Sequence, residues 1–185
     1  MRSSLTNKSI VLDLDSTLLY THGFGDKEAG MTSPRYNPRY YDMYIEDFNN
    51  PGGGDYIRMF GELRPNAEEF VDFCNRYFEH VIVWSAGKHS YVHSLVHFLF
   101  RSTYYPSAIF TYDDLPSHYN GKIIKDLNIV YNRCKKFLVN PPSESTTMVL
   151  DDAGTTFELN PHNAIHIPAY KGGSDDRELN YISAS

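Results

Sequence analysis

Short apolar runs that alternate with amphipathic stretches are the main pattern along this chain. Runs of four or five residues, rich in β-branched side chains, predict buried strands. They cover residues 9–13, 80–84, 108–111, 146–150 and 164–167. Between several of these runs, apolar residues recur at helical spacing. The predicted helices cover residues 65–78, 89–101 and 128–137.

Strands that alternate with helices predict the α/β class, with a central parallel sheet covered by helices on both faces. In such sheets ligands bind beyond the carboxyl ends of the strands. Polar residues follow three of the predicted strands: Asp13 and Asp15, then Ser85, then Asp151 and Asp152. We therefore expect these side chains to meet at one rim of the sheet.

The segment from about residue 24 to residue 63 interrupts the alternation. Residues 23–38 are rich in Gly, Pro and polar side chains, which predicts a loop. Two strand-like stretches, 40–48 and 55–63, flank the sequence NNPGGG, which is a strong turn signal. A β-hairpin is therefore expected here, as a small insert in a single domain that covers residues 1–185.

Composition and charge narrow the classes of ligand. The chain has 185 residues, 41% of them apolar and 22% charged, as in ordinary globular domains. Its formal net charge of -6 argues against nucleic acid as a ligand, because phosphate backbones select basic surfaces. Cys74 and Cys134 cannot build a disulfide framework, which favours an intracellular setting, cytoplasmic or nuclear. A run of 18 apolar residues is absent from the sequence, so we expect no membrane span.

The segment Asp13-Leu14-Asp15-Ser16-Thr17 comes directly after the first predicted strand and indicates phosphate chemistry. An aspartate can attack phosphorus when a divalent cation neutralises the charge on both anions. A second carboxylate two positions later can serve as general acid and general base if its pKa is raised. The alternative interpretation is that both aspartates are solvated carboxylates in a turn.

Six segments, taken together, resemble one known family. The residues that carry the likeness are Asp13–Leu19, Arg64–Phe70, Val83–Ala86, Ile124–Leu127, Val149–Asp152 and Phe157–Ile165. In this order and spacing they resemble the haloacid-dehalogenase-type (HAD) phosphatases, and within them the RNA polymerase II C-terminal-domain phosphatases. That family is also called NLI-interacting-factor-like or FCP/SCP-like, and its core is the FCP1 homology domain. The resemblance implies a HAD-like Rossmannoid fold with a small β insert after the first strand.

The resemblance also implies catalytic roles. Asp13 would be the nucleophile, Asp15 the general acid and base, and Lys125 the cation that neutralises the phosphoryl group. Lys122 is a rival for the lysine role, but it lies outside the family's Lys-Asp-Leu segment. The implied phosphate-binding residues are Thr17, Ser85, Ala86 and Lys125.

Mg²⁺ is the cofactor that the resemblance implies. Its ligands would be the Asp13 carboxylate, the backbone carbonyl of Asp15 and the Asp152 carboxylate, with Asp151 in support. Such hard oxygen ligands favour magnesium on independent grounds. Ser16 stands where the family commonly has Glu, which leaves the metal chemistry intact. The Asp151-Asp152 pair replaces the Asp-Asn of many small members, so we expect a changed metal affinity and pH optimum.

The function that follows is a magnesium-dependent protein serine/threonine phosphatase, acting on a phosphoprotein or phosphopeptide through an aspartyl-phosphate. One alternative is a small-molecule or nucleic-acid-end phosphatase on the same scaffold. Another is a non-catalytic, phosphatase-like binding protein, although that class would be expected to lack Asp13 or Asp15.

Two further groups of side chains could have a structural or a functional role: the tyrosines of the insert and the histidines of the second predicted helix. The tyrosines of the insert either pack the hairpin onto the domain or form an aromatic wall that contacts the substrate. They are Tyr36, Tyr40, Tyr41, Tyr44 and Tyr56. Histidines at i, i+4 and i+8 of the second helix are interpreted as a polar helix face rather than a zinc site. They are His89, His93 and His97.

Overall fold

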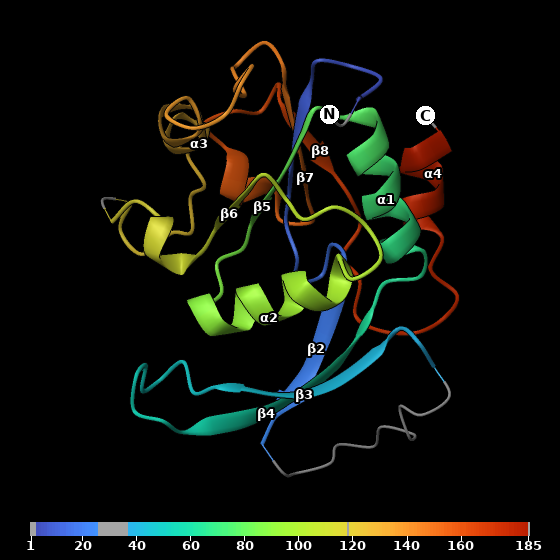
Figure 1. Cartoon of the computed structure of the whole chain (residues 1–185), viewed down its shortest axis with the longest axis vertical. Coiled ribbons are helices and arrows are strands. Elements are labelled where there is room, and N and C mark those ends of the chain that lie inside the picture. Colours follow the sequence, from blue (N-terminus) through green and yellow to red (C-terminus); the bar gives the residue numbers. More distant parts are fainter. Residues whose placement is uncertain (1–2, 26–36, 118, 185) are drawn as a thin grey trace.

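A five-stranded parallel sheet forms the centre of the fold (Figure 1). The computed structural model describes residues 3–25, 37–117 and 119–184. The strands of this sheet are β1 (Ser9–Leu12), β5 (His80–Trp84), β6 (Ala108–Phe110), β7 (Thr147–Asp151) and β8 (Ala164–His166). Their order is β6-β5-β1-β7-β8, and each neighbouring pair is parallel. The predicted α/β class is therefore confirmed.

Helices cover both faces of this sheet, as predicted. One face carries α1 (Ala67–Tyr77), α2 (His89–Leu99) and α4 (Glu178–Ala184), and the other carries α3 (Leu127–Cys134). Alternate side chains of a strand point to opposite faces. Ile10 and Leu12 accordingly pack in the cluster that contains α1 and α2, whereas Val11 packs in the cluster that contains α3. Because β1 is buried on both faces, its sequence is continuously apolar rather than alternating.

A second, antiparallel sheet lies apart from the first, with α2 running between the two (Figure 1). Its strands are β2 (Leu19–Phe24), β3 (Tyr40–Glu46) and β4 (Tyr56–Leu63), in the order β2-β4-β3. The expected hairpin of β3 and β4 is confirmed. The sheet begins with β2 at Leu19, before the residue 24 at which we expected the insert to start. Residues 26–36, which hold Tyr36 and most of the expected loop, lie outside the described residues.

Two elements have no counterpart among the predicted ones. β2 has the sequence LYTHGF, in which polar residues and glycine dilute the strand pattern. Helix α4 is only seven residues long; its Leu179 is buried in the larger core cluster, and the helix packs beside α1. Short 3₁₀ turns at Tyr112–Asp114 and Gly154–Phe157 complete the described secondary structure.

None of the helices in the described ranges is long and apolar enough to cross a lipid bilayer.

Leu95 tests the packing of α2 on the central sheet. The side chain is fully buried in the larger core cluster, so Leu95→Ala should lower the free energy of unfolding by about 2–5 kcal/mol. Leu5 is the matched control because it is 78% exposed, and Leu5→Ala should change stability by less than about 0.5 kcal/mol. Urea titrations followed by circular dichroism measure both values. Equal losses in the two variants would contradict the described core.

Candidate active site

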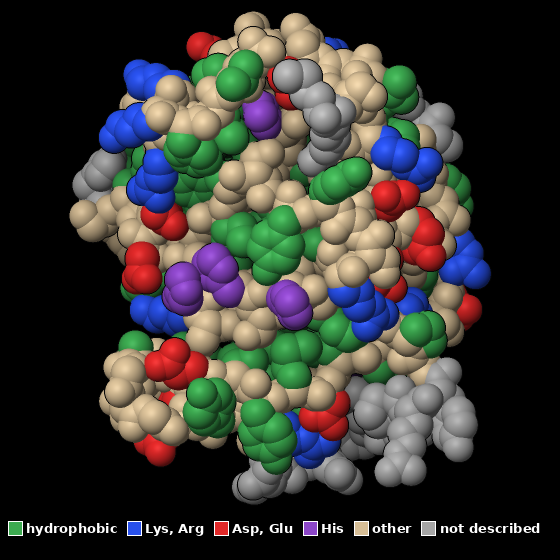
Figure 2. All heavy atoms as spheres, viewed as in Figure 1, with side chains coloured by type: hydrophobic (Ala, Val, Ile, Leu, Met, Phe, Trp, Pro, Cys, Tyr) green, Lys and Arg blue, Asp and Glu red, His purple; other side chains and the backbone are tan. Residues whose placement is uncertain are grey.

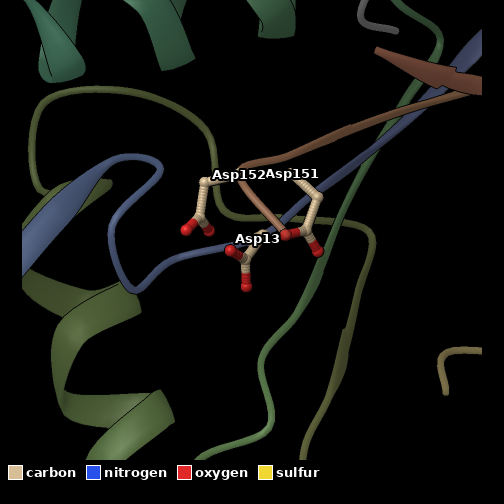
Figure 3. Close-up of side chains that lie close together, drawn as sticks. All are labelled: Asp13, Asp151 and Asp152. Carbon is tan, nitrogen blue, oxygen red and sulfur yellow. The ribbon is translucent and has the colours of Figure 1, made fainter. Parts of the chain in front are cut away.

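The three central strands bring polar side chains to one rim of the sheet. Strand β1 lies between β5 and β7, so the carboxyl end of β1 is about 5 Å from that of each neighbour. Ser85 follows β5, Asp13 follows β1, and Asp151 ends β7 with Asp152 after it. Figure 3 shows Asp13, Asp151 and Asp152 close together at this edge. One carboxylate oxygen from each lies within 4.8 Å of the others.

Lys125 lies between two of these carboxylates. Its ammonium Nζ is 2.9 Å from Asp13 Oδ1 and 3.0 Å from Asp151 Oδ2, and all three side chains are buried. The backbone N–H of Lys125 donates to the carbonyl of Thr156 at 2.7 Å, which fixes the segment before α3. Lys122, the rival lysine, is exposed. Of the two lysines, the structure places Lys125 at the rim.

Burial and the charges of neighbouring groups both shift the pKa values of Asp13, Asp151 and Lys125. Burial raises the pKa of Asp13, and the nearby Lys125 ammonium offsets only part of that rise. Burial also raises the pKa of Asp151, as does the charge of Asp13. For Lys125, burial lowers the pKa, but the two carboxylates outweigh it and the net pKa is raised. Lys125 therefore keeps its positive charge and is the counterion of both aspartates.

The hydroxyl of Thr17 links Asp13 to Asp152. Thr17 Oγ1 lies 2.8 Å from Asp13 Oδ2 and 3.1 Å from Asp152 Oδ1, and can donate its hydrogen to either. In return it accepts a hydrogen bond from the backbone N–H of Asp152 at 3.1 Å. Thr17, which is itself fully buried, thus sets the spacing of two carboxylates that come from different strands.

Asp151 and Asp152 differ in how their oxygens are used. Asp151 Oδ2 accepts hydrogen bonds from Lys125 and from the hydroxyl of Thr156, and Oδ1 accepts one from the backbone N–H of Ala153. Asp152 is half-buried, and its side chain meets Asp13 through Thr17. Carboxylates from Asp13 and Asp152 form an oxygen-only donor set of the kind that Mg²⁺ prefers. The donor set therefore fits a hard divalent cation, with Asp151 engaged by Lys125.

Asp15 is held by two hydroxyl groups. Tyr91 donates to Asp15 Oδ1, and Ser85 Oγ lies 3.5 Å from Oδ2. Burial raises the pKa of Asp15 to about 6, against the opposing effect of the Tyr91 hydrogen bond. A carboxyl group with such a pKa can exchange a proton near neutral pH. Ala86 follows Ser85 and is half-buried.

The hydroxyl of Tyr91 connects Asp15 to the small sheet. Thr21 Oγ1 on β2 is 2.7 Å from the Tyr91 hydroxyl and 2.8 Å from the hydroxyl of Tyr41 on β3. Because Tyr91 donates its hydrogen to Asp15, it accepts one from Thr21, and Thr21 accepts one from Tyr41. The result is a directed chain of three hydroxyl groups that ends on Asp15.

Sequence reasoning did not find Tyr91, Thr21 or Thr156 as parts of the site. The sequence holds one weak indication of Tyr91, which is the glycine at position 87, between Ser85 and Tyr91. A Cβ atom at Gly87 would lie 2.6 Å from the Tyr91 ring, so only glycine lets the ring reach Asp15. Thr21 and Thr156 stand in ordinary polar contexts, and their partners are far away in the sequence.

The tyrosines and histidines singled out in the sequence lie in different surroundings. Tyr41 is buried and packs in the core cluster, whereas Tyr44 and Tyr56 are 67% and 69% exposed on the hairpin. The His89 and His93 rings stack with their centroids 4.0 Å apart. Figure 2 shows histidine side chains gathered across the middle of one face, over α2. Within the described ranges, the group of side chains suited to a metal is the aspartate cluster.

Comparison with known proteins finds a matching family model and two similar proteins. The family model of the NLI interacting factor-like phosphatases matches residues 8–184. A "Probable C-terminal domain small phosphatase" of Dictyostelium discoideum is 24% identical over 173 residues, which are 93% of this chain and 47% of the relative. The CTD nuclear envelope phosphatase 1B of Danio rerio is 24% identical over 183 residues, 96% of this chain and 64% of the relative. This chain therefore spans less than two thirds of either relative.

Solved structures share the fold. The structure of Fcp1, an essential RNA polymerase II CTD phosphatase, superposes with a TM-score of 0.63 at 16% identity, covering 96% of this chain and 48% of that chain. The R271A form of the fission yeast enzyme bound to beryllium fluoride gives 0.60, also at 16% identity, covering 95% and 45%. These likenesses confirm the expected fold class.

Replacement of Lys125 tests the ion group. Lys125→Met leaves two buried carboxylates without a counterion, so the free energy of unfolding at pH 7 should fall by about 3–5 kcal/mol. The pKa values of Asp13 and Asp151 would rise further, because Lys125 lowers both. Carboxyl groups with a raised folded-state pKa bind more protons when folded, so the deficit should shrink as the pH falls from 7 toward 3.8.

The measurement is urea unfolding in EDTA, which prevents a divalent cation from replacing the lost charge. Lys122→Met is the control, because its side chain is exposed and the change should cost less than about 0.5 kcal/mol. A deficit for Lys125→Met that grows on acidification would contradict the assignment of Lys125 as the counterion.

Proposed function

Because this chain belongs to the NLI interacting factor-like phosphatase family, we propose that it is a magnesium-dependent phosphomonoesterase with Asp13 as covalent nucleophile. One observation carries the proposal. The Asp13 carboxylate lies at the rim of the sheet between a buried lysine on one oxygen and Thr17 on the other. A surface turn carboxylate would have neither contact, which speaks against the solvated-turn alternative.

The cation would be held by the carboxylates of Asp13 and Asp152 and the backbone carbonyl of Asp15. When bound, Mg²⁺ would reduce the repulsion between the Asp13 carboxylate and an incoming phosphate dianion, and would favour the charged form of Asp13. Thr17 keeps the two carboxylates at a fixed spacing. Asp151 would act indirectly, by holding Lys125 in place.

The proposed reaction has two steps, both carried by residues of this chain. In the first, a carboxylate oxygen of Asp13 bonds to phosphorus while the bond to the leaving oxygen breaks, and Asp15 gives that oxygen its proton. In the second, Asp15 takes a proton from water, whose oxygen attacks phosphorus and releases phosphate and free Asp13. Lys125 would balance the negative charge on the phosphoryl group throughout. The hydroxyl of Ser85 and the neighbouring Ala86 backbone would bind the phosphoryl oxygens.

A pKa near 6 suits Asp15 for this double role. The group must be protonated when the leaving oxygen departs and ionised when water attacks, so a value near the working pH serves both steps. Asp13, as nucleophile, must stay ionised despite burial, and Lys125 supplies part of the opposing charge.

The proposed substrate is a phosphoserine or phosphothreonine side chain of a protein. The names of both curated relatives and of the solved structures point to phosphoprotein chemistry. Between Ser85 and Lys125, the described residues form α2, β6 and one 3₁₀ turn, which leaves little chain for a cap over the site. A rim without a cap from this part of the chain would favour a protein substrate over a small metabolite.

Asp13→Asn tests the mechanism. The amide cannot attack phosphorus as a carboxylate does, so hydrolysis of p-nitrophenyl phosphate with Mg²⁺ should fall by roughly 1,000-fold or more. Asp152→Asn is the matched acid-to-amide control. It keeps a carbonyl oxygen for the cation and creates the Asp-Asn pair that many small family members carry, so activity should be kept at a higher Mg²⁺ concentration. Wild-type activity that survives EDTA, or an active Asp13→Asn variant, would overturn the proposal.

A phosphopeptide panel tests the substrate class. Serine- and threonine-phosphorylated peptides, including polymerase-tail repeats, should be turned over with a kcat/KM at least about 10-fold above that for small metabolite phosphates, because a peptide offers more contacts at an open rim. Phosphate release with Mg²⁺ present gives the values. A preference for metabolite phosphates or nucleic-acid ends would favour the alternative substrate class, and no turnover at all would favour a binding protein.

A further inference from the structure

The turn that follows β1 is held from behind by residues outside the site. We call residues 14–19 the nucleophile turn. Three successive carbonyl groups of this turn accept hydrogen bonds from outside it. The Ser16 carbonyl accepts from the Tyr170 N–H at 2.8 Å, the Thr17 carbonyl from Arg64 Nη1 at 3.0 Å, and the Leu18 carbonyl from the Arg64 N–H at 2.8 Å.

Arg64 is the centre of this arrangement. Its side chain has no exposed surface, which is unusual for arginine and needs a complete set of partners. Asp176 binds it through two parallel hydrogen bonds, Nε to Oδ1 at 2.8 Å and Nη2 to Oδ2 at 2.9 Å. Arg64 Nη2 also donates to the Pro168 carbonyl at 2.8 Å. A guanidinium can make such a two-pronged contact and still reach two carbonyl groups, whereas an ammonium cannot.

Apart from the Thr17 carbonyl, the hydrogen-bond partners of the Arg64 side chain come from one C-terminal segment, residues 167–177, which we call the C-terminal strap. The strap is anchored independently of Arg64. Tyr170 is buried and its hydroxyl donates to Glu62, whose Oε1 also accepts the N–H of Gly173 at 2.7 Å. Asp176 Oδ1 accepts the N–H of Glu178, at the start of α4. The strap is thus tied to the small sheet at one end and to α4 at the other.

The position of the turn decides the position of the reacting groups. Ser16 has a φ of 63°, a left-handed conformation that costs a residue with a Cβ atom energy and needs fixed surroundings. Thr17 presents its carbonyl to Arg64 and its hydroxyl to Asp13 and Asp152. A shift of the Thr17 backbone would therefore move the hydroxyl that sets the spacing of the two carboxylates.

We propose that Arg64 and Asp176 are positioning residues for the phosphatase reaction: Asp176 orients Arg64, and Arg64 holds the nucleophile turn through the carbonyls of Thr17 and Leu18. This inference rests on the proposed function. It assigns to the C-terminal strap a role in the rate of the chemical step and not only in stability. The hydrogen bonds of Arg64 and Asp176 described above go to the turn, the strap and α4, and not to the carboxylates of Asp13 or Asp15.

Asp176→Asn is the decisive variant. The amide keeps an acceptor for the start of α4 but loses the charge and the two-pronged contact with Arg64. We expect kcat for p-nitrophenyl phosphate to fall about 10- to 100-fold with KM changed less than threefold, because misplacement by less than an ångström acts on the transition state. Arg64→Lys should behave alike, and the double variant should lose no more than the worse single one, because both act through one contact.

Leu179→Ala is the matched control. Leu179 is a buried residue of α4, so its truncation loosens the end of the strap without removing any hydrogen bond to the turn. At a temperature where all variants remain folded, Leu179→Ala should keep kcat within about threefold of the wild type. Hydrogen exchange of a peptide covering residues 13–19 should be faster in Asp176→Asn than in Leu179→Ala.

The two proposals fail in different ways. An inactive wild-type protein would overturn the proposed function, while the exchange experiment would still show whether Arg64 and Asp176 hold the turn. An active wild type with kcat unchanged in Asp176→Asn, or lowered equally in Leu179→Ala, would overturn the positioning role alone.

Discussion

Lys125 brings one positive charge into a buried region where Asp13 and Asp151 bring two negative charges. Taking ions out of water costs several kcal/mol for each ion, and only close, well-directed contacts offset that cost. Three chain segments that are far apart in the sequence must meet within 3.0 Å to provide those contacts. With Asp152 at the edge, the group keeps an excess of negative charge, which agrees with the proposed divalent cation.

The sheet and the order of its polar side chains follow from the sequence because local rules govern them. A continuously apolar strand such as β1 must be buried on both faces, and its first polar residue must then stand at the rim. Asp13, Ser85 and Asp151 could be assigned to one edge for this reason alone. The position of Lys125 could not be predicted in this way, because Lys125 does not follow a strand of the sheet. Lys125 was preferred to Lys122 only because it lies in the Lys-Asp-Leu segment that resembles the family.

The elements and contacts that could not be predicted from the sequence depend on partners that are distant in the chain. β2 is half polar and becomes a strand only because β4 pairs with it. Helix α4 is short and is fixed by the contact of Leu179 with the core. Arg64 opens one of the segments that resemble the family, but nothing local in the sequence shows that it is buried against Asp176, 112 positions later. Hydrophobic periodicity describes which face is buried and cannot identify which polar groups satisfy one another there.

The chain of hydroxyl groups from Tyr41 through Thr21 and Tyr91 to Asp15 has a consequence for how this fold can diversify. Two of its members belong to the small sheet, and the third belongs to the helix beside it. Replacement of the small sheet by another insert would remove Thr21 and Tyr41, the two hydroxyl groups that support Tyr91, which is the donor to Asp15. Any remodelling of the insert must therefore carry these hydroxyls along, which ties the evolution of one sheet to the chemistry at the edge of the other.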